Sequence, residues 1–155
     1  MSDVRAQLRE DLKSAMKAKD KQRTGTIRML LAAVQEEETK GSKHELSEAD
    51  LIQVVAREIK KRRESAQVYA DNGRQELADA ELAEVAVLED YQPTQLSDEE
   101  LSTLVDAAVA QVRTDTGEDV SMKHMGQVMK AAQAAAAGRA DGKRLSTAVR
   151  ERLQS

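Results

Sequence analysis

The residues best suited to chemistry lie in the last quarter of the chain, in the segment GRADGKR at 138–144. Three cations, Arg139, Lys143 and Arg144, surround a glycine-rich turn, and Lys130 lies eight residues before Gly138. The turn precedes a segment with helical spacing, and the amide dipoles at a helix N-terminus favour an anion. The pattern is typical of a corner that holds a phosphate, and equally of a charged helix face that only contacts solvent. Our hypothesis for nucleic-acid binding names Lys130, Arg139, Lys143 and Arg144.

Catalysis has much less support in the sequence. His44 and His124 are the only imidazoles and the chain has no cysteine, so a zinc site or a catalytic triad has too few members. We expect both histidines on surface helices or loops, and no cofactor or metal. The segment 138–143 is not a P-loop, because three residues rather than four separate its glycines and Arg144 replaces the Ser or Thr that binds magnesium.

Two amphipathic helices must position the corner. The first helix has apolar residues at i, i+3, i+4, i+7 and i+11, counted from Met125. The second has them at i, i+4 and i+8, counted from Leu145. We expect Gly138 at a left-handed position after the first helix, and Asp141 as the N-cap of the second. The motif residues with a structural role are Met125, Gly126, Met129, Gly138, Asp141 and Gly142, together with Pro93 further upstream.

The rest of the chain is also periodic at helical spacing, and glycines or capping residues separate its segments. Pro93 forbids helix continuation and favours an extended backbone at Gln92. Ser97 and Glu100 then have the spacing of a capping box. We therefore predict an all-α protein, with a four-helix unit at 1–92, a linker at 93–96 and a three-helix unit at 97–155.

Composition limits the class of protein. The net charge of −4 over 155 residues hides a segregation: residues 1–30 have eight basic and four acidic side chains, 71–119 have two and fourteen, and 123–155 have seven and two. Binding to nucleic acid should therefore be confined to one face. The sequence has no cysteine, no apolar leader after Met1 and no long apolar run. We therefore expect a cytoplasmic protein with no membrane segment.

A second basic cluster occupies residues 57–63. Glu58 with Arg62, and Lys60 with Glu64, are spaced i, i+4, which favours salt bridges within one helix over a binding site. Arg62 lies beside the apolar stripe, so we expect its aliphatic stem to cover the edge of the core while the guanidinium reaches water.

Five segments of the chain resemble the GatB/YqeY family. Two lie near the C-terminus, MGQVMK and GRADGK. Three lie upstream: DLKSAMKAKDKQRTGTIRMLLAAV, EIKKRRESAQVYADNGR and VLEDYQPTQLSDEEL. This family joins free-standing bacterial YqeY-like proteins to the helical tail of the B subunit of the aspartyl/glutamyl-tRNA amidotransferase. The resemblance to that tail is limited to the C-terminal part. Two positions depart from the family: Ala137, often lysine, and Gln92, usually apolar.

The resemblance implies a tRNA-facing helical module, and by family a link to carbon-nitrogen ligase activity with glutamine as amido-N-donor. The larger domains that hydrolyse glutamine and transfer ammonia have no counterpart here, so we expect no catalysis by this chain alone. Partners would be tRNA or another structured RNA, or a protein of tRNA amidation or translation.

Two functional hypotheses remain open. One is recognition of RNA by shape and phosphate charge, because two Tyr with no Phe or Trp offer no platform for base stacking. The alternative is a protein-interaction adaptor that docks through the acidic middle and the alanine-rich helix, without nucleic acid.

Overall fold

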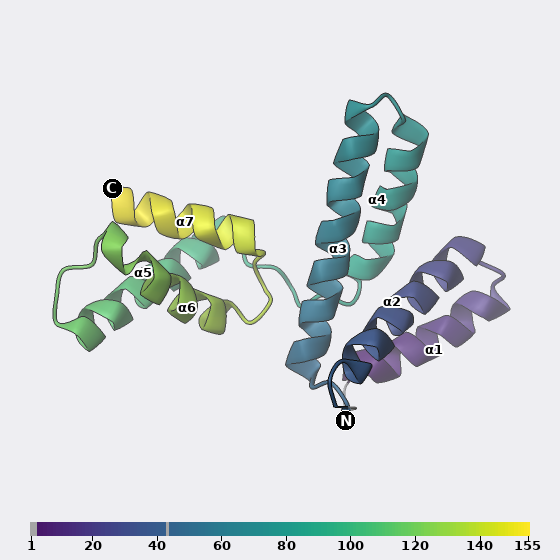
Figure 1. Cartoon of the computed structure of the whole chain (residues 1–155), viewed down its shortest axis with the longest axis horizontal. Helices are drawn as coiled ribbons and strands as arrows, with labels where there is room; N and C mark the ends of the chain where they lie inside the picture. Colours follow the sequence, from purple (N-terminus) through teal and green to yellow (C-terminus); the bar gives the residue numbers. More distant parts are fainter. Residues whose placement is uncertain (1–2, 43) are drawn as a thin grey trace. The chain divides into compact units, whose positions relative to one another are not determined.

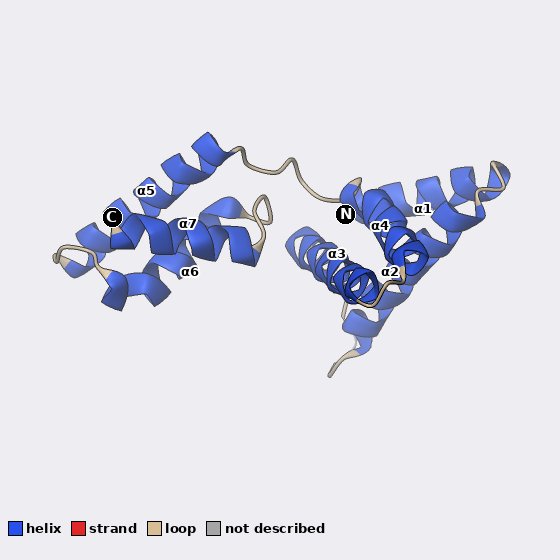
Figure 2. Ribbon diagram, turned by 90° about the horizontal axis from the view of Figure 1, so that it is seen from above, coloured by secondary structure: helices blue, strands red, loops and turns tan. Residues whose placement is uncertain are grey.

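A computed structural model describes residues 3–42 and 44–155. These residues form seven α-helices and one short 3₁₀ helix, and they contain no strand (Figure 2), which confirms the prediction of an all-α protein. The elements are α1 (Asp3–Lys17), α2 (Lys21–Thr39), α3 (Glu48–Asp71), α4 (Gln75–Glu89), α5 (Asp98–Thr116), η1 (Met122–His124), α6 (Met125–Ala136) and α7 (Gly142–Gln154).

The chain divides into two compact units, one ending at Gln92 and the other beginning at Pro93. Figure 1 shows α1 to α4 in the first unit and α5 to α7 in the second. Each unit has its own cluster of buried apolar side chains. Among the helices of the described residues, none combines the length and the apolar character that a bilayer span requires.

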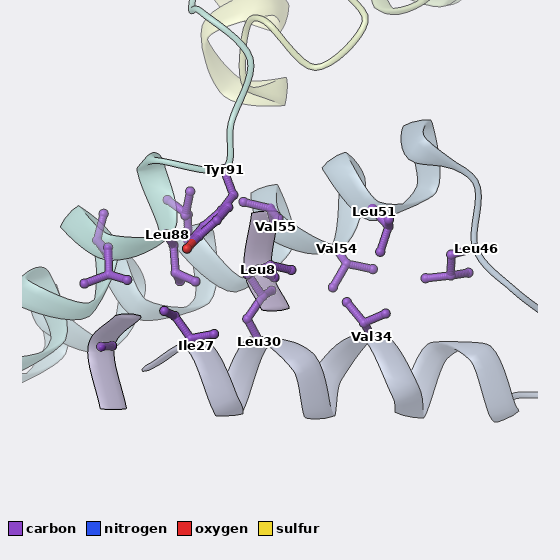
Figure 3. Packing of buried hydrophobic residues seen from close by; sticks show 14 residues of the cluster. Leu8, Ile27, Leu30, Val34, Leu46, Leu51, Val54, Val55, Leu88 and Tyr91 are labelled. Carbon is purple, nitrogen blue, oxygen red and sulfur yellow. The ribbon is translucent and has the colours of Figure 1, made fainter. Parts of the chain in front are cut away.

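The first unit consists of two helical hairpins, α1–α2 and α3–α4, around one core. Figure 3 shows side chains from all four helices and the following turn meeting there, including Leu8, Leu30, Val55 and Leu88. The buried Tyr91 closes the end of this core, and its hydroxyl donates to Asp11 Oδ2 at 2.6 Å. Burial, together with the Asp11 carboxylate, raises the pKa of Tyr91.

Local capping chemistry explains where several helices begin. Asp20 accepts from Arg23 N at 3.0 Å, and Ser47 Oγ accepts from Asp50 N at 3.2 Å. At the start of α5 the exchange is reciprocal: Ser97 Oγ accepts from Glu100 N, and Glu100 Oε1 accepts from Ser97 N. Side-chain oxygens thus satisfy amides that a helix start leaves without partners.

Arg62 differs from its predicted position. It is only 5% exposed, so the expectation that its guanidinium reaches water is wrong. Its Nη1 donates to Glu58 Oε1 at 3.0 Å, and its Nε donates to Glu84 Oε2 at 2.7 Å. The second carboxylate comes from α4, so local spacing on α3 gives no sign of it. Removing a charged guanidinium from water costs free energy, and hydrogen-bonded carboxylates such as these two offset that cost.

The second unit is a bundle in which α5 and α7 run in the same direction. Asp98 on α5 pairs with Arg144 on α7 at 2.8 Å, and eight residues further along both helices Asp106 pairs with Arg152 at 2.8 Å. Both pairs lie outside a core that Val105, Val128 and Leu145 help to fill. The equal spacing of these pairs shows that α5 and α7 are parallel, so α6, which lies between them in the sequence, runs in the opposite direction.

Candidate nucleic-acid interface

The corner between α6 and α7 is built from two residues with left-handed backbone and one cap. Ala137 has φ +48° and Gly138 has φ +82°, and together they reverse the chain after Ala136. Asp141 Oδ1 then accepts from Arg144 N at 2.7 Å and starts α7. Ala137 is the more strained of the two, because an L side chain adopts positive φ only at a cost.

The segment before α5 is bonded to this corner rather than free. Leu96 N donates to Arg139 O at 2.8 Å, and Gln95 Nε2 donates to Gly138 O at 3.2 Å. In return, Arg139 Nε donates to Thr94 O at 2.8 Å. Residues 94–96, which the sequence suggests as part of a linker, therefore fix the corner in place.

The four predicted phosphate ligands differ in what they already bind. Arg144 pairs with Asp98, and the Arg139 guanidinium lies 3.8 Å from Glu100 Oε2. Lys130 and Lys143 are exposed, and neither has an ion pair with the acidic side chains that the structure describes. A shallow groove between α5 and α7 contains Lys143 and Arg144 together with Asp98, so its charge is mixed.

An anion would not bind the N-terminus of α7 directly. The carboxylate of Asp141 already accepts the amide of Arg144 there, and it would repel a phosphate at the same position. Phosphate binding at this corner must therefore rely on side chains. The sequence suggested that the α7 helix dipole contributes to phosphate binding, but the Asp141 carboxylate already lies at the positive end of that dipole.

The remaining motif residues have structural surroundings. Met125 and Met129 pack half-buried against the core of the second unit, and Pro93 is half-buried at its start. A Cβ at Gly126 or Gly142 would meet no atom within 4 Å. Close packing therefore does not explain these two glycines.

His124 is the second residue that the sequence misplaces. It is buried, at 5% exposure, so the expectation of a surface position is wrong. Its Nδ1 accepts from Ser121 N at 3.0 Å, and its Nε2 lies 3.2 Å from Glu118 Oε2. Because a backbone amide donates to Nδ1, the ring proton belongs on Nε2, facing the carboxylate. Hydrogen bonds from Lys123 and His124 lower the pKa of Glu118.

His124 thus closes the loop before α6. No group of three or more His, Asp or Glu side chains within residues 3–42 and 44–155 is arranged to hold a metal ion. His44 lies exposed, with Nδ1 2.9 Å from Ser42 O. The chemistry that the corner offers is recognition of an anion by Lys and Arg side chains.

Comparison with known proteins identifies a family and several relatives. The sequence model of the family described as Yqey-like protein matches residues 5–153. The chain is 37% identical over 126 residues to "Altered inheritance of mitochondria protein 41, mitochondrial" of Kluyveromyces lactis, covering 79% of this chain and 65% of that protein. The protein of the same name in Eremothecium gossypii is 32% identical over 118 residues, covering 75% and 64%. The match thus spans less than two thirds of these relatives.

These relatives correct one prediction from the sequence. Both are named as mitochondrial proteins, so the expectation of a plain cytoplasmic location is wrong. The physical reason is that a chain without cysteine excludes disulfides but does not distinguish one reducing compartment from another. Both are fungal proteins, whereas the resemblance in the sequence analysis is to bacterial members.

Proposed function

The chain belongs to the YqeY-like family, and on this premise we propose that it is a helical module that binds tRNA, or another structured RNA, through phosphate contacts. The contacts are made by Lys130, Arg139, Lys143 and Arg144 in the second unit. The module acts as an accessory to glutamine-dependent tRNA amidation or to another step that handles tRNA, and we assign no catalysis to the chain itself.

The observation that carries the proposal is the orientation of Arg139. Its Nε donates a hydrogen bond to Thr94 O, and its Nη2 forms an ion pair with Glu100 Oε2 at 3.8 Å, beyond hydrogen-bond distance. A guanidinium held in one orientation loses less entropy on binding, and its terminal N–H groups match the spacing of phosphate oxygens. The 40% exposure of the side chain leaves this edge accessible.

Arg144 can bind the same phosphate backbone as Arg139 if a phosphate replaces Asp98 as its partner. Asp98 is 93% exposed, and an exposed pair of this kind contributes only about 0 to 1 kcal/mol. A phosphate, with its greater charge, can replace the carboxylate. Lys143 is adjacent in sequence and has no competing carboxylate among the described residues.

Base reading is not part of the proposal. Tyr91 is buried and bonded to Asp11, and Tyr69 is half-buried. Without exposed aromatic rings, unpaired bases have nothing to stack on. The module should therefore prefer folded RNA and show little dependence on sequence.

The test is a titration of labelled tRNA with the wild-type chain and with Lys130→Glu/Lys143→Glu. Both lysines are exposed and have no ion pair among the described residues, so these substitutions should leave melting nearly unchanged. We expect weaker binding and a smaller log-log salt slope, with a decrease of roughly 0.7 to 0.9 for each phosphate that the variant no longer neutralises.

Lys60→Glu/Lys61→Glu on α3 makes the same change in net charge and is the charge control. Because Lys60 pairs with Glu64 at 4.0 Å, thermal melting of this control is measured beside its affinity. Equal affinities of the corner variant and this control would overturn the corner as the binding site. If the wild-type chain purifies with a protein that stays bound after nuclease treatment, and does not bind tRNA, the adaptor function replaces the proposal.

One observation favours that adaptor as the second candidate. The α3–α4 hairpin exposes 60% of Val68 and 46% of Leu82, and of these Leu82 lies within the acidic segment 71–119. The alanine-rich helix contributes less, because Ala132 and Ala136 are buried in the core of their own unit. A protein partner would therefore dock on the hairpin.

A further inference from the structure

The cations without ion pairs are unevenly distributed. Six lie between residues 9 and 28 and have no acidic partner among the residues described: Arg9, Lys13, Lys17, Lys19, Lys21 and Arg28. Elsewhere in the first unit almost every described Lys or Arg forms an ion pair, as do Arg57 with Glu37 and Arg63 with Glu89; Lys61 is the exception. If these cations served only to keep the protein soluble, there would be no reason for the unpaired ones to gather in one segment and the paired ones elsewhere.

Helix geometry places three of these cations in one row on α1, and a contact brings a fourth to the same side. Arg9, Lys13 and Lys17 follow one another at i, i+4 and i+8, which forms a row about 12 Å long on one flank of α1. Arg9 also lines a groove with Leu31 of α2. Glu38 and Glu45 line the same groove, and both carboxylates pair with Arg5. Arg28 of α2 approaches the same flank, because its Nη2 lies 3.7 Å from Met16 Sδ. We call this surface, made by the six cations, the α1–α2 basic face.

The turn between the two helices adds a second, independent observation. Lys19 has φ +58°, a left-handed conformation that glycine adopts at lower cost. The lysine is exposed, and its side chain forms no hydrogen bond or ion pair within the described residues. The left-handed backbone closes the end of α1, because Lys19 N donates to Met16 O at 3.1 Å and Asp20 N donates to Ala15 O at 3.0 Å. Glycine is the usual residue at such a position, and the turn itself does not need the positive charge that lysine adds.

We propose that the α1–α2 basic face is a second RNA-binding surface, which holds the phosphates of a folded RNA. The inference rests on the proposed function for the class of ligand, but it assigns the contact to different residues in the other unit. Six cations without internal partners can each release counterions on binding phosphate, which is the main source of affinity for nucleic acid.

The chemistry of the face favours RNA over a lipid surface or a protein. A helix that binds a membrane inserts a broad apolar face, whereas the apolar residues of α1, such as Leu8 and Ala15, are buried in the core. Met16, at 50% exposure, is the large apolar side chain exposed there. Protein interfaces usually have an apolar or aromatic centre, which a face of Lys and Arg does not provide.

The test uses two variants of the full chain. Lys13→Gln/Lys17→Gln/Lys21→Gln removes three charges without adding acidic ones, and Lys13→Arg/Lys17→Arg/Lys21→Arg retains them. For the glutamine variant we expect tRNA affinity to fall about tenfold or more, and the log-log salt slope to fall by roughly 0.7 to 0.9 per phosphate released from the face. The arginine variant should bind like wild type.

Lys19→Gly distinguishes function from structure. A purely structural position would tolerate glycine in every assay, since glycine relieves the positive φ. We expect the melting temperature of this variant to stay equal or rise while its tRNA affinity falls. Opposite directions in the two measurements support a binding role for Lys19, and an unchanged affinity contradicts it.

The remaining outcomes separate the two proposals. If the glutamine variant binds tRNA like wild type while Lys130→Glu/Lys143→Glu binds weakly, the α1–α2 basic face is not an RNA site and the corner stands. The reverse result supports the face and removes the corner. Binding of wild type to vesicles of anionic phospholipid, with none to tRNA, overturns both in favour of a membrane surface.

Discussion

Arg139 and Thr94 are joined by a hydrogen bond across 45 residues of chain, from the guanidinium Nε to the backbone carbonyl at 2.8 Å. A residue that the sequence suggests only as a phosphate ligand therefore also holds the start of the second unit to its corner. Its backbone carbonyl makes a second connection, since it accepts from Leu96 N. Stability and the proposed binding role thus depend on one residue.

Arg139→Ala should lower the free energy of unfolding by about 1 kcal/mol, because Thr94 O loses its donor. Arg139→Lys should recover little of this, since an ammonium cannot reproduce the Nε–H geometry. Lys143→Ala, as the control, should stay within about 0.5 kcal/mol of wild type. Urea unfolding of the three variants measures the differences. Equal stability of Arg139→Ala and Lys143→Ala would show that the bond to Thr94 contributes nothing.

Ala137→Gly should stabilise the chain by about 1 kcal/mol, because glycine relieves the left-handed strain at φ +48°. Gly117→Ala is the reciprocal change. Gly117 has φ +69° and a Cβ there would meet no atom within 4 Å, so backbone strain alone should destabilise this variant by a similar amount. Thermal melts check both signs. A loss of stability in Ala137→Gly would contradict this assignment of strain.

Arg62→Ala should be among the most damaging single changes, at about 3 to 5 kcal/mol, because it leaves a nearly buried carboxylate at Glu58 without its cation. Adding Glu58→Gln to the variant removes that charge and should recover part of the loss. The free energies from denaturant unfolding of the single and double variants measure this coupling. If the double variant is the less stable one, the buried-charge explanation fails.

Stability should fall in acid partly through Glu38. A hydrogen bond from Leu46 N at 3.0 Å, and then Arg5, lower the pKa of this carboxyl below its usual value. Since the folded pKa is the lower one, the stabilisation is complete above the unfolded value of about 4.3 and is lost as pH falls through the folded pKa. Melting temperatures from about pH 7 to about pH 3 should drop less steeply for Glu38→Gln than for wild type. Parallel curves would exclude this carboxyl as a contributor.

Features that depend on local sequence could be predicted, and those that depend on distant partners could not. The Ser97 and Glu100 spacing predicts the start of α5, because a capping box needs only four residues. Arg62 and His124 are different. The burial of Arg62 depends on Glu84 from the next helix, and that of His124 depends on a loop with no periodic pattern.

The candidate site shows the same limit. The corner's turn and cap follow from Gly138, two residues after the end of α6, and from Asp141, directly before the start of α7. The left-handed backbone at Ala137 has no such signal in the sequence. The pairing of Arg144 with Asp98 spans 46 residues, so composition alone cannot tell a paired cation from a free one. The equal eight-residue spacing of Asp98 to Asp106 and of Arg144 to Arg152 is a signal that could have indicated it.

The most direct measurement of the central claim is the affinity of the wild-type chain for a purified tRNA between about 50 and 200 mM salt. We predict an affinity that weakens steeply with salt, with a log-log slope that corresponds to several phosphate contacts and is reduced by substitutions at Lys130 and Lys143. Control substitutions at Lys60 and Lys61 should leave that slope unchanged. A wild-type chain that does not bind tRNA at the lowest salt, or binds it with no salt dependence, would contradict the proposed function.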